Sequence, residues 1–320
     1  MIRLEMHGRL GNQLFQYAAA RSLQMKTGQR ILISFRQVNG ANTEGNKGWE
    51  NSLKYFRVCN YTEYSGKRSL LFYKMPIKSQ MVGLIYAISY RPYINDINKL
   101  YKYQIKWKDI LNKNGLFWIA NGYLKFDNYF CKEYFLNGSF ESPKYFNDIR
   151  ETLLDEIRPI SEVSQKCKVL YNDILQKNSV CVSIRHFELN NESKRLYDVC
   201  TPEYYKKAVE FLEGKLDNPV FVLFSDDIHW AKKVFGNDIN KHNFIFESEG
   251  FEVWEKLQLM SSCKHFVISN STFSWWAQYL ATYKEKIIIS PDKWFNNEFR
   301  SPLIEKGWIK INGDGRIVNS

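Results

Sequence analysis

Residues 263–282 read CKHFVISNSTFSWWAQYLAT, and this stretch joins three patterns in order. His265 to Ile268 is a short apolar, β-branched run, which predicts a buried strand. Small hydroxyl and amide side chains follow at 269–272, and from Phe273 apolar residues recur every three or four positions, as in a helix. A strand, a polar turn and a helix together aim backbone N–H groups at an anion, so we interpret the turn as a phosphate site. The alternative is an ordinary strand-to-helix turn with good capping residues.

The second half of the chain repeats this alternation of strands and helices. Strands are predicted at 180–184, 219–224, 244–246 and 287–289, with helices at 202–213, 228–235 and 252–262. Such alternation predicts a doubly wound parallel sheet, in which ligands bind at the carboxyl ends of the strands. Arg185, the pair Asp226 and Asp227, and the turn at 271–274 all follow predicted strands. Their convergence at one sheet edge supports a binding site more strongly than any one of them.

The residue types at these strand ends suit a nucleotide diphosphate. The guanidinium of Arg185 can bind a diphosphate through two parallel hydrogen bonds, and the hydroxyls of the 271–274 turn add neutral donors. The carboxylate of Asp226 can accept hydrogen bonds from a purine edge or a ribose. No G-x-x-x-x-G-K-[ST] loop is present, which argues against a P-loop ATPase. The sequence also lacks an Asp-x-Asp pair and a His/Asp metal cluster, so we expect a sugar-nucleotide transferase without a metal.

The chain begins with a predicted βαβ unit. An alternating strand over 1–6 leads into residues 7–18, HGRLGNQLFQYA, where two glycines three residues apart suit a tight turn near a ligand. A helix follows as far as Gly28, and a second strand is predicted at 31–34. The motif is not the G-x-G-x-x-G dinucleotide fingerprint. The amides after Gly11 favour hydrogen bonds to a hydroxyl-rich ligand, and helix capping is the alternative.

A net charge of +11 and an aromatic content of 16% indicate an anionic partner and surfaces that stack on ligands. The basic residues concentrate at 67–108, where nine Lys or Arg stand against the single acid Asp96 and alternate with tyrosines. This pattern is typical of nucleic-acid binding or of an anionic membrane surface. The alternative is a helical face whose lysines cover an aromatic core.

The six cysteines are scattered, with no C-x-x-C pair, and are interpreted as buried free thiols in a reducing compartment. The chain opens on a strand with no signal peptide, and no run of 18 apolar residues occurs. We therefore expect a cytoplasmic protein that is peripheral at the inner membrane. Pro159 suggests a boundary between an N-terminal domain at 1–158, which carries the basic-aromatic insertion at about 67–108, and a C-terminal domain at 159–320.

These motifs together resemble a known family. The segments 8–17, 138–146, 224–227, 268–276 and 291–295 are similar, in the same order, to motifs of the bacterial α-1,2-fucosyltransferases of glycosyltransferase family 11. The diphosphate motif of that family usually reads His-x-Arg-Arg-x-Asp, whereas residues 183–188 here read Ser-Ile-Arg-His-Phe-Glu. Arg185 keeps the first arginine, His186 replaces the second, and Glu188 replaces the aspartate.

The resemblance implies an α/β fold of the GT-B-like kind, with two Rossmann-type lobes and a donor cleft between them. The C-terminal lobe would bind the nucleotide sugar and the N-terminal lobe would approach the acceptor. The implied reaction moves L-fucose from GDP-β-L-fucose to the 2-hydroxyl of a terminal galactose, with inversion and without a metal or cofactor. Its implied partners are GDP-fucose and a galactose-terminated oligosaccharide, with peripheral membrane contact through 67–108 and no nucleic acid.

Roles for individual residues follow from the same resemblance. The implied catalytic residues are Arg185, Glu188 and Asn12. The implied donor-binding residues are His7, Gly8, Gly11, Gln13, Arg185, His186, Asp226, Asp227, Asn270, Ser271, Thr272, Phe273 and Ser274. Arg185 would stabilise charge on the departing GDP, and Glu188 is the expected base by position. Two other readings are a GDP-sugar transferase with another donor or linkage, and a basic protein that binds membranes or nucleic acid through 67–108.

Overall fold

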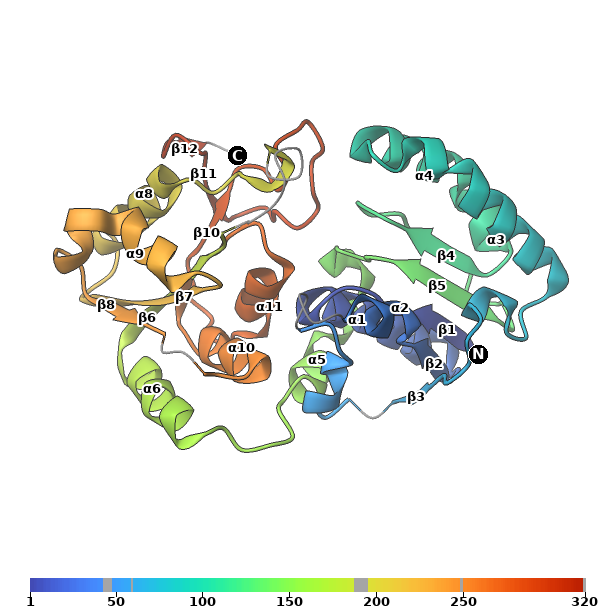
Figure 1. The fold of residues 1–320 in the computed structure, drawn as a ribbon, viewed down its shortest axis with the longest axis horizontal. Coiled ribbons are helices and arrows are strands. Elements are labelled where there is room, and N and C mark those ends of the chain that lie inside the picture. The colour runs from blue at the N-terminus through green and yellow to red at the C-terminus, as the bar shows by residue number, and fades with distance from the viewer. Residues whose placement is uncertain (43–47, 59, 187–194, 248–249, 319–320) are drawn as a thin grey trace. The chain divides into compact units, whose positions relative to one another are not determined.

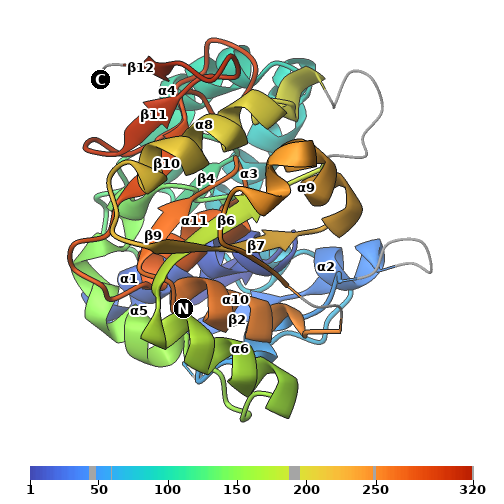
Figure 2. The same ribbon diagram turned by 90° about the vertical axis from the view of Figure 1, so that its left-hand side faces the viewer.

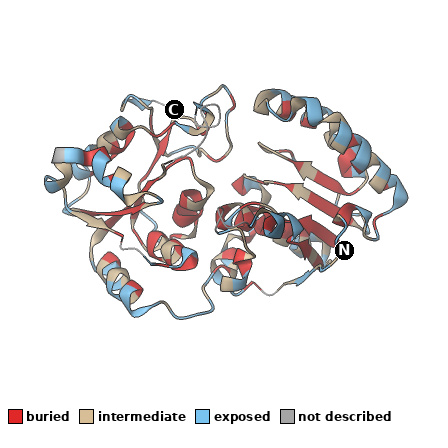
Figure 3. Ribbon diagram, in the orientation of Figure 1, coloured by how far each residue is buried: buried red, intermediate tan, exposed pale blue. Residues whose placement is uncertain are grey.

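The computed structural model describes residues 1–42, 48–58, 60–186, 195–247 and 250–318. The chain divides into two compact units, Met1–Ile160 and Ser161–Ser320, and each contains one main sheet (Figure 1). Strands are buried in both units, while the outward faces of the surrounding helices are exposed (Figure 3). Each unit is therefore an α/β layer structure with its own core.

Among the described residues, the N-terminal unit has five parallel strands in the order β3-β2-β1-β5-β4. They are β1 (Ile2–Glu5), β2 (Ile31–Ser34), β3 (Tyr61–Glu63), β4 (Leu116–Ile119) and β5 (Tyr134–Gly138). The helix α1 (Leu10–Thr27) joins β1 to β2 and ends where Gly28 adopts a left-handed φ of 68°. The βαβ unit predicted at the start of the chain is thereby confirmed.

Other helices of this unit surround the sheet. They are α2 (Arg36–Ala41), α3 (Ile77–Ser89), α4 (Ile97–Lys113) and α5 (Arg150–Glu156), with 3₁₀ turns η1 (Ser52–Tyr55), η2 (Leu70–Phe72), η3 (Arg91–Tyr93), η4 (Pro143–Tyr145) and η5 (Asn147–Ile149). Three elements of this unit, α2, η1 and β3, were not predicted from the sequence. These elements are short, so their hydrophobic periodicity is too brief to be read.

The basic-aromatic segment 67–108 contributes α3 and α4, which pack over β4 and β5. Several of its rings form a cluster: Tyr86 is fully buried, and its ring centroid lies 5.3 Å from that of Trp118 and 5.6 Å from that of Trp107. The packing of this segment therefore agrees with the alternative given for it above, a helical face whose lysines cover an aromatic core. An outward-facing apolar stripe on α3, described below, was not predicted.

Two buried charges of β1 hold the start of this segment. The Arg3 side chain donates to the carbonyls of Tyr73 at 2.5 Å and Lys74 at 3.2 Å. The Glu5 carboxylate accepts from the hydroxyl of Ser69 at 2.7 Å and from the N–H of Leu70 at 2.6 Å. Because buried charges are stable only when hydrogen-bonded, these contacts fix the segment on the central strand.

In the C-terminal unit, the described part of the chain forms seven strands in the order β12-β11-β10-β9-β6-β7-β8. They are β6 (Asn178–Ile184), β7 (Pro219–Ser225), β8 (Phe244–Phe246), β9 (His265–Val267), β10 (Ile288–Pro291), β11 (Ile309–Ile311) and β12 (Ile317–Val318). Neighbouring strands are parallel except β11 and β12. The first five confirm the predicted strands, whereas β11 and β12 are too short to have been predicted.

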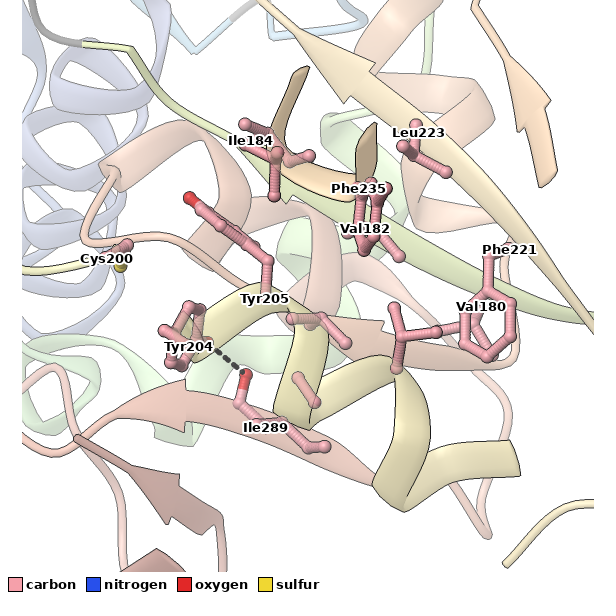
Figure 4. Close-up of a cluster of buried hydrophobic side chains, with 14 of the residues drawn as sticks. Val180, Val182, Ile184, Cys200, Tyr204, Tyr205, Phe221, Leu223, Phe235 and Ile289 are labelled. Atoms are coloured by element: carbon pink, nitrogen blue, oxygen red, sulfur yellow. Dashed lines mark hydrogen bonds between the residues drawn. The ribbon is translucent and has the colours of Figure 1, made fainter. Parts of the chain in front are cut away.

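The helices of this unit cover both faces of the sheet (Figure 2). They are α6 (Gln165–Gln176), α8 (Pro202–Glu213), α9 (Ile228–Phe235), α10 (Val253–Ser261) and α11 (Thr272–Leu280), with the turn η6 (Gly236–Asn240). Helix α8 begins as predicted, because the Thr201 hydroxyl accepts from the N–H of Tyr204 at 3.3 Å and Pro202 takes the first position. Helices α8 and α9 pack on the face that carries Val182, Leu223 and Ile289 (Figure 4).

The described cysteines are all unpaired. Cys167, Cys181, Cys200 and Cys263 are buried, as expected, while Cys131 is half-buried. Burial raises the pKa of the Cys200 thiol to about 12, so this thiol is protonated and behaves as a small core side chain.

Candidate active site

The strand order of the C-terminal sheet reverses beside β6. From β6 the chain proceeds to β7 and β8 on one side, and then returns to β9 and β10 on the other side. At such a reversal, the loops that leave adjacent strands diverge and create a place for a ligand. The residues that follow β6, β7 and β9 are Arg185 and His186, Asp226 and Asp227, and the 268–271 turn.

Four of the predicted residues are in direct contact at this edge. The Arg185 Nη1 lies 2.7 Å from the Asp226 Oδ2, and each side chain is about one-third exposed. The other carboxylate oxygen of Asp226 accepts from the backbone N–H of His186 at 2.9 Å. The Nδ1 of His186 lies 3.0 Å from the Asp227 Oδ2. Both aspartates after β7 therefore orient the two residues after β6.

Asp227 also begins the helix α9. Its Oδ1 accepts from the N–H of Trp230 at 2.9 Å, and this hydrogen bond lowers the pKa of the Asp227 carboxyl, with His186 adding to the effect. The indole of Trp230 stacks on the His186 ring, with centroids 4.8 Å apart and 5° between the planes. His186 is thus held by a carboxylate and by an aromatic plane.

The turn between β9 and α11 is organised by its own buried side chains. The Ser274 hydroxyl is fully buried and lies 3.0 Å from the carbonyl of Ser269 and 2.9 Å from that of Ser271. The Asn270 side chain is buried and donates to the carbonyls of Tyr197 and Trp294, at 2.9 and 3.0 Å. Asn270 and Ser274 were both predicted to contact the donor. Their side-chain amide and hydroxyl instead bond to backbone carbonyls and stabilise the turn.

Ser271, Thr272 and Phe273 are half-buried at the start of α11. Ser271 occupies the N-cap position without a side-chain capping bond. The first turn of a helix directs its N–H groups along the axis, away from the helix body, and they carry a partial positive charge. The strand and the helix predicted for this stretch are confirmed, and phosphate binding at this end of α11 stays a prediction.

Supporting residues were missed by sequence reasoning. The Tyr204 hydroxyl, fully buried, donates to the carbonyl of Ile268 at 2.6 Å, and the Tyr205 hydroxyl accepts from the N–H of Arg185 at 3.3 Å. The buried Glu247 accepts from the N–H of Ser225 at 3.0 Å and pairs with Lys256 at 3.1 Å. In the sequence, these tyrosines look like ordinary core positions of α8.

The N-terminal unit has an equivalent edge, where β1 and β5 are neighbours and the strand order also reverses. Burial lowers the pKa of His7, against an opposing effect of the Gly138 backbone, and keeps the imidazole neutral near pH 7. Gly8 has a φ of 77°, and a Cβ there would lie 2.7 Å from the Asn12 Cβ. A glycine is therefore required where this turn closes on α1.

The other predicted residues of this edge serve the turn itself. Gly11 is buried in α1. The Gln13 amide is fully buried and donates to the carbonyls of Gly8 at 2.9 Å and Glu50 at 2.8 Å, while its oxygen accepts from Ser52. Glu188, the predicted base, lies outside the described residues.

The mid-chain segment 138–146 contains an acidic residue, Glu141, to which sequence reasoning assigned no role. Glu141 is half-buried and makes no hydrogen bond or ion pair with any described residue. Burial raises the pKa of its carboxyl to about 7. Its position shortly after a predicted strand end is the feature of the sequence that could have identified it as a functional residue.

The match to known proteins covers nearly the whole chain. Residues 1–312 match the profile of glycosyl transferase family 11. The chain belongs to glycosyltransferase family 11. It is similar to the O-antigen biosynthesis glycosyltransferase WbnK of Escherichia coli, with 29% identity over 330 residues that cover 95% of this chain and 98% of the relative.

Two further relatives carry more specific names. The α-1,2-colitosyltransferase of Escherichia coli is 28% identical over 309 residues, which cover 95% of this chain and 96% of the relative. Galactoside α-(1,2)-fucosyltransferase 1 of Saimiri sciureus is 24% identical over 213 residues, which cover 62% and 57%. This family 11 glycosyltransferase therefore resembles bacterial relatives over almost their entire length.

Solved structures of the fucosyltransferase NodZ from Bradyrhizobium have a similar fold. One matches with a TM-score of 0.52 and 13% identity, covering 88% of this chain and 92% of that chain. Another, of NodZ α-1,6-fucosyltransferase soaked with GDP-fucose, matches with a TM-score of 0.54 and 13% identity, covering 93% and 97%. The family 11 chain has the GT-B fold, with two Rossmann-type α/β units.

Within the ranges that the structure describes, no group of three His, Cys, Asp or Glu side chains is placed to hold a metal ion. No helix of the described ranges combines the length and apolar character needed to cross a bilayer.

Proposed function

We propose that this glycosyltransferase moves L-fucose from GDP-β-L-fucose to the 2-hydroxyl of a terminal galactose in a glycan, with inversion of the anomeric carbon. The observation that carries the proposal is the 2.7 Å pair of Arg185 and Asp226 at the sheet reversal of a family 11 chain. The α-1,2 linkage in the names of two relatives supports the position of transfer.

In the proposed reaction, the bond between fucose and the diphosphate breaks and negative charge grows on the departing GDP. Arg185 would offer two parallel N–H groups to the diphosphate oxygens, and Asp226 holds the guanidinium in place. The N-terminus of α11 would add backbone donors from a second direction. Donors fixed before the reaction stabilise developing charge with little reorganisation, which is how such a site accelerates cleavage.

His186 would be a further donor in place of the second arginine of the usual family motif. Its Nδ1 lies 3.0 Å from the Asp227 Oδ2, and only the doubly protonated ring can also donate from Nε2 to a phosphate oxygen. Asp226 was expected to hold the guanine or ribose, yet both its oxygens are engaged with Arg185 and His186. We therefore propose a positioning role for Asp226.

Colitose is a second candidate for the transferred sugar, favoured by the name of the E. coli α-1,2-colitosyltransferase. Colitose is fucose without its 3-hydroxyl, so the two donors share the GDP group that the C-terminal unit would bind. A site built to hydrogen-bond that hydroxyl rejects the deoxy sugar strongly, whereas a purely apolar site discriminates little.

The deciding experiment is calorimetric titration of the protein with GDP-fucose, GDP-colitose and GDP-mannose, with EDTA present throughout. We expect GDP-fucose to bind most tightly, and α-1,2-fucosylated product to form from a β-galactoside acceptor. If GDP-colitose binds more tightly and its sugar is transferred faster, then colitose is the transferred sugar and fucose is not. Binding of none of the three would contradict a GDP-sugar donor, and a requirement for a metal would contradict the metal-independent mechanism.

A further inference from the structure

Glu141 follows β5 at the edge where β1 and β5 meet. The register pairs Glu5 with Asn137, so the residues after β1 and after β5 leave the sheet side by side. The Gly138 backbone also acts on the pKa of the His7 ring, so these two exits are close neighbours. Glu141 therefore stands at the reversal of the N-terminal sheet, the edge at which parallel α/β sheets bind ligands.

The backbone around Glu141 is firmly fixed. Gly138 has a φ of 142°, and the N–H of Ser139 donates to the carbonyl of Ile119 at 3.0 Å. Phe140 has a φ of 51° and is buried, with its ring edge-on to Tyr145 at 5.5 Å. Ser142, also buried, caps the turn η4. A residue other than glycine with a left-handed φ is strained and persists only where its surroundings fix it. The turn therefore holds the backbone of Glu141 in one conformation.

The carboxyl of Glu141 takes no part in holding the fold together. Other buried acids have partners, such as Ser69 for Glu5 and Lys256 for Glu247. Glu141 has none among the described residues, and burial alone raises its pKa to about 7. Maintaining an unpaired, poorly solvated carboxyl is costly, and such groups concentrate at functional sites.

The ionisable groups on the neighbouring elements do not supply a counter-charge. His7 is kept neutral by burial, because its pKa is lowered. The Lys144 ammonium lies over the Tyr123 ring at 5.3 Å, and the Tyr145 hydroxyl accepts from the N–H of Leu124 at 2.9 Å. Glu141 thus titrates close to neutral pH, where an acid can act as a proton acceptor.

We propose that Glu141 is the general base of the transfer, an inference that rests on the proposed fucosyl transfer. Its ionised carboxylate accepts the proton of the galactose 2-hydroxyl as that oxygen forms a bond to the anomeric carbon of fucose. The bond between this carbon and the diphosphate oxygen breaks at the same time, and GDP leaves with the electron pair. The proton remains on Glu141 until the product has departed.

The test compares Glu141→Gln with the wild type in transfer and binding assays. Removing a general base costs about 100-fold or more in kcat, while the Kd for GDP-fucose should stay unchanged because the donor is bound by the other unit. In the wild type, kcat/KM should fall as pH drops below about 7, and this acidic limb should disappear in the variant. Glu141→Asp should restore part of the rate.

Glu305→Gln is the matched control. Glu305 is also half-buried with a pKa raised by burial, and it lies near Lys286, which precedes β10 at the opposite edge of its sheet. This variant should keep both the rate and the pH profile. If the wild type transfers fucose and Glu141→Gln keeps the full kcat and the acidic limb, the role of Glu141 is overturned but the proposed function is not. Absence of any transfer from GDP-fucose by the wild type would overturn the proposed function as well.

A second and independent observation concerns the outer face of α3. Five apolar side chains of this helix are 47–76% exposed and recur at helical spacing along one stripe: Ile77, Met81, Leu84, Ile85 and Ile88. The opposite face is buried through Ser79, Gly83 and Tyr86. Single exposed apolar residues are common, but a continuous stripe marks a contact surface.

Unpaired positive charges accompany this stripe. The exposed basic side chains without an ion pair to any described residue are Lys67, Arg68, Lys74, Lys78, Arg91, Lys102 and Lys106. Lys99 and Lys108 instead pair with Asp96 and Asp109. An apolar helical face in a segment rich in lysine and arginine is typical of helices that lie in the interface of anionic membranes.

We infer that α3 binds the headgroup region of an anionic lipid bilayer. Its stripe inserts among the lipid chains near their polar ends, while the surrounding lysines and arginines contact lipid phosphates. A second copy of this chain is the poorer occupant, because two such faces would bring like charges together.

Co-flotation with vesicles tests this surface. The wild type should bind vesicles of phosphatidylcholine and phosphatidylglycerol but not of phosphatidylcholine alone, and binding should weaken as salt is raised. The variant Leu84→Gln with Ile88→Gln should lower the partition coefficient about 10-fold or more. The control, Val169→Gln with Leu175→Gln, replaces two similarly exposed residues of α6 and should leave binding unchanged.

Three outcomes would overturn the membrane assignment. They are equal binding of neutral and anionic vesicles, an equal loss of binding in both double variants, and no vesicle binding by the wild type. Sedimentation velocity that shows a dimer abolished by Leu84→Gln with Ile88→Gln would assign the stripe to a second copy.

Discussion

The imidazole of His186 lies parallel to the indole of Trp230, with ring centroids 4.8 Å apart, while Asp227 bonds to its Nδ1 at 3.0 Å. The ring is therefore held on one face by the indole and at Nδ1 by the carboxylate. His186, which replaces the second arginine of the family motif, thus has two partners that fix its orientation.

From this stack we expect Trp230→Leu to weaken GDP-fucose binding about 3- to 10-fold, because an aromatic pair contributes on the order of 1 kcal/mol beyond its area. His186→Ala should weaken binding at least as much. His186→Arg should keep the affinity, since an arginine can both pair with Asp227 and stack on the indole. Calorimetric titration measures each Kd, and weaker binding by His186→Arg than by His186→Ala would contradict this account.

The Arg185–Asp226 pair gives a second prediction. Arg185→Lys should lower kcat about 100-fold or more, because lysine cannot make two parallel bonds to a diphosphate. Asp226→Asn should raise the Kd for the donor, since the guanidinium loses its charged partner. Arg21→Lys is the control. Arg21 also pairs with a carboxylate, that of Glu156 at 2.8 Å, but this pair does not belong to the candidate site. Full activity of Arg185→Lys in a steady-state assay would refute the proposed role.

Gly138→Ala tests the turn that presents Glu141. A Cβ on Gly138 would lie 1.7 Å from the Ile119 carbonyl oxygen, and the φ of 142° is unfavourable for any other residue. We expect a loss of about 3 kcal/mol or more in the free energy of unfolding. Gly40→Ala in α2 is the control, because nothing lies within 4 Å of its added Cβ. Urea denaturation compares the two, and equal midpoints would contradict the expectation.

The buried pair Glu247–Lys256 gives a pH-dependent prediction. Burial raises the pKa of Glu247, and Lys256 opposes this rise. Lys256→Met should therefore destabilise the protein by about 1–2 kcal/mol at pH 7, where the buried carboxylate loses its partner. The loss should shrink as pH falls through the raised pKa, because the folded state takes up the proton more readily than the unfolded state.

Urea denaturation of Lys256→Met at several pH values measures this effect. Adding Glu247→Gln to the variant should restore stability at pH 7, since an amide needs no counter-charge. An equal loss at all pH values would show that Lys256 acts by packing and not by charge.

Much of the C-terminal fold could be predicted because its signals are local. Thr201 and Pro202 mark the start of α8, and the run from Pro219 marks β7. Because the strand ends of a parallel sheet converge, the sequence also predicted that Arg185 and Asp226 lie close together.

The remainder depended on packing that no local pattern reports. Ser274 and Gln13 are polar residues in turns, and the sequence does not tell whether such a side chain faces a ligand or a backbone carbonyl. Tyr205 supports Arg185 from a helix position that resembles any core residue. The isolation of Glu141 is visible only once its neighbours are placed.

The pairing of β1 with β5 also sets the order in which the N-terminal unit assembles on the ribosome. Ile2 is synthesised before its partner Tyr134, which emerges only after β2, β3 and β4 have been made. Until then, the central strand has one unpaired edge, and contacts so distant in sequence form slowly. A nascent chain halted before Tyr134 is therefore expected to be the aggregation-prone stage in the synthesis of this enzyme.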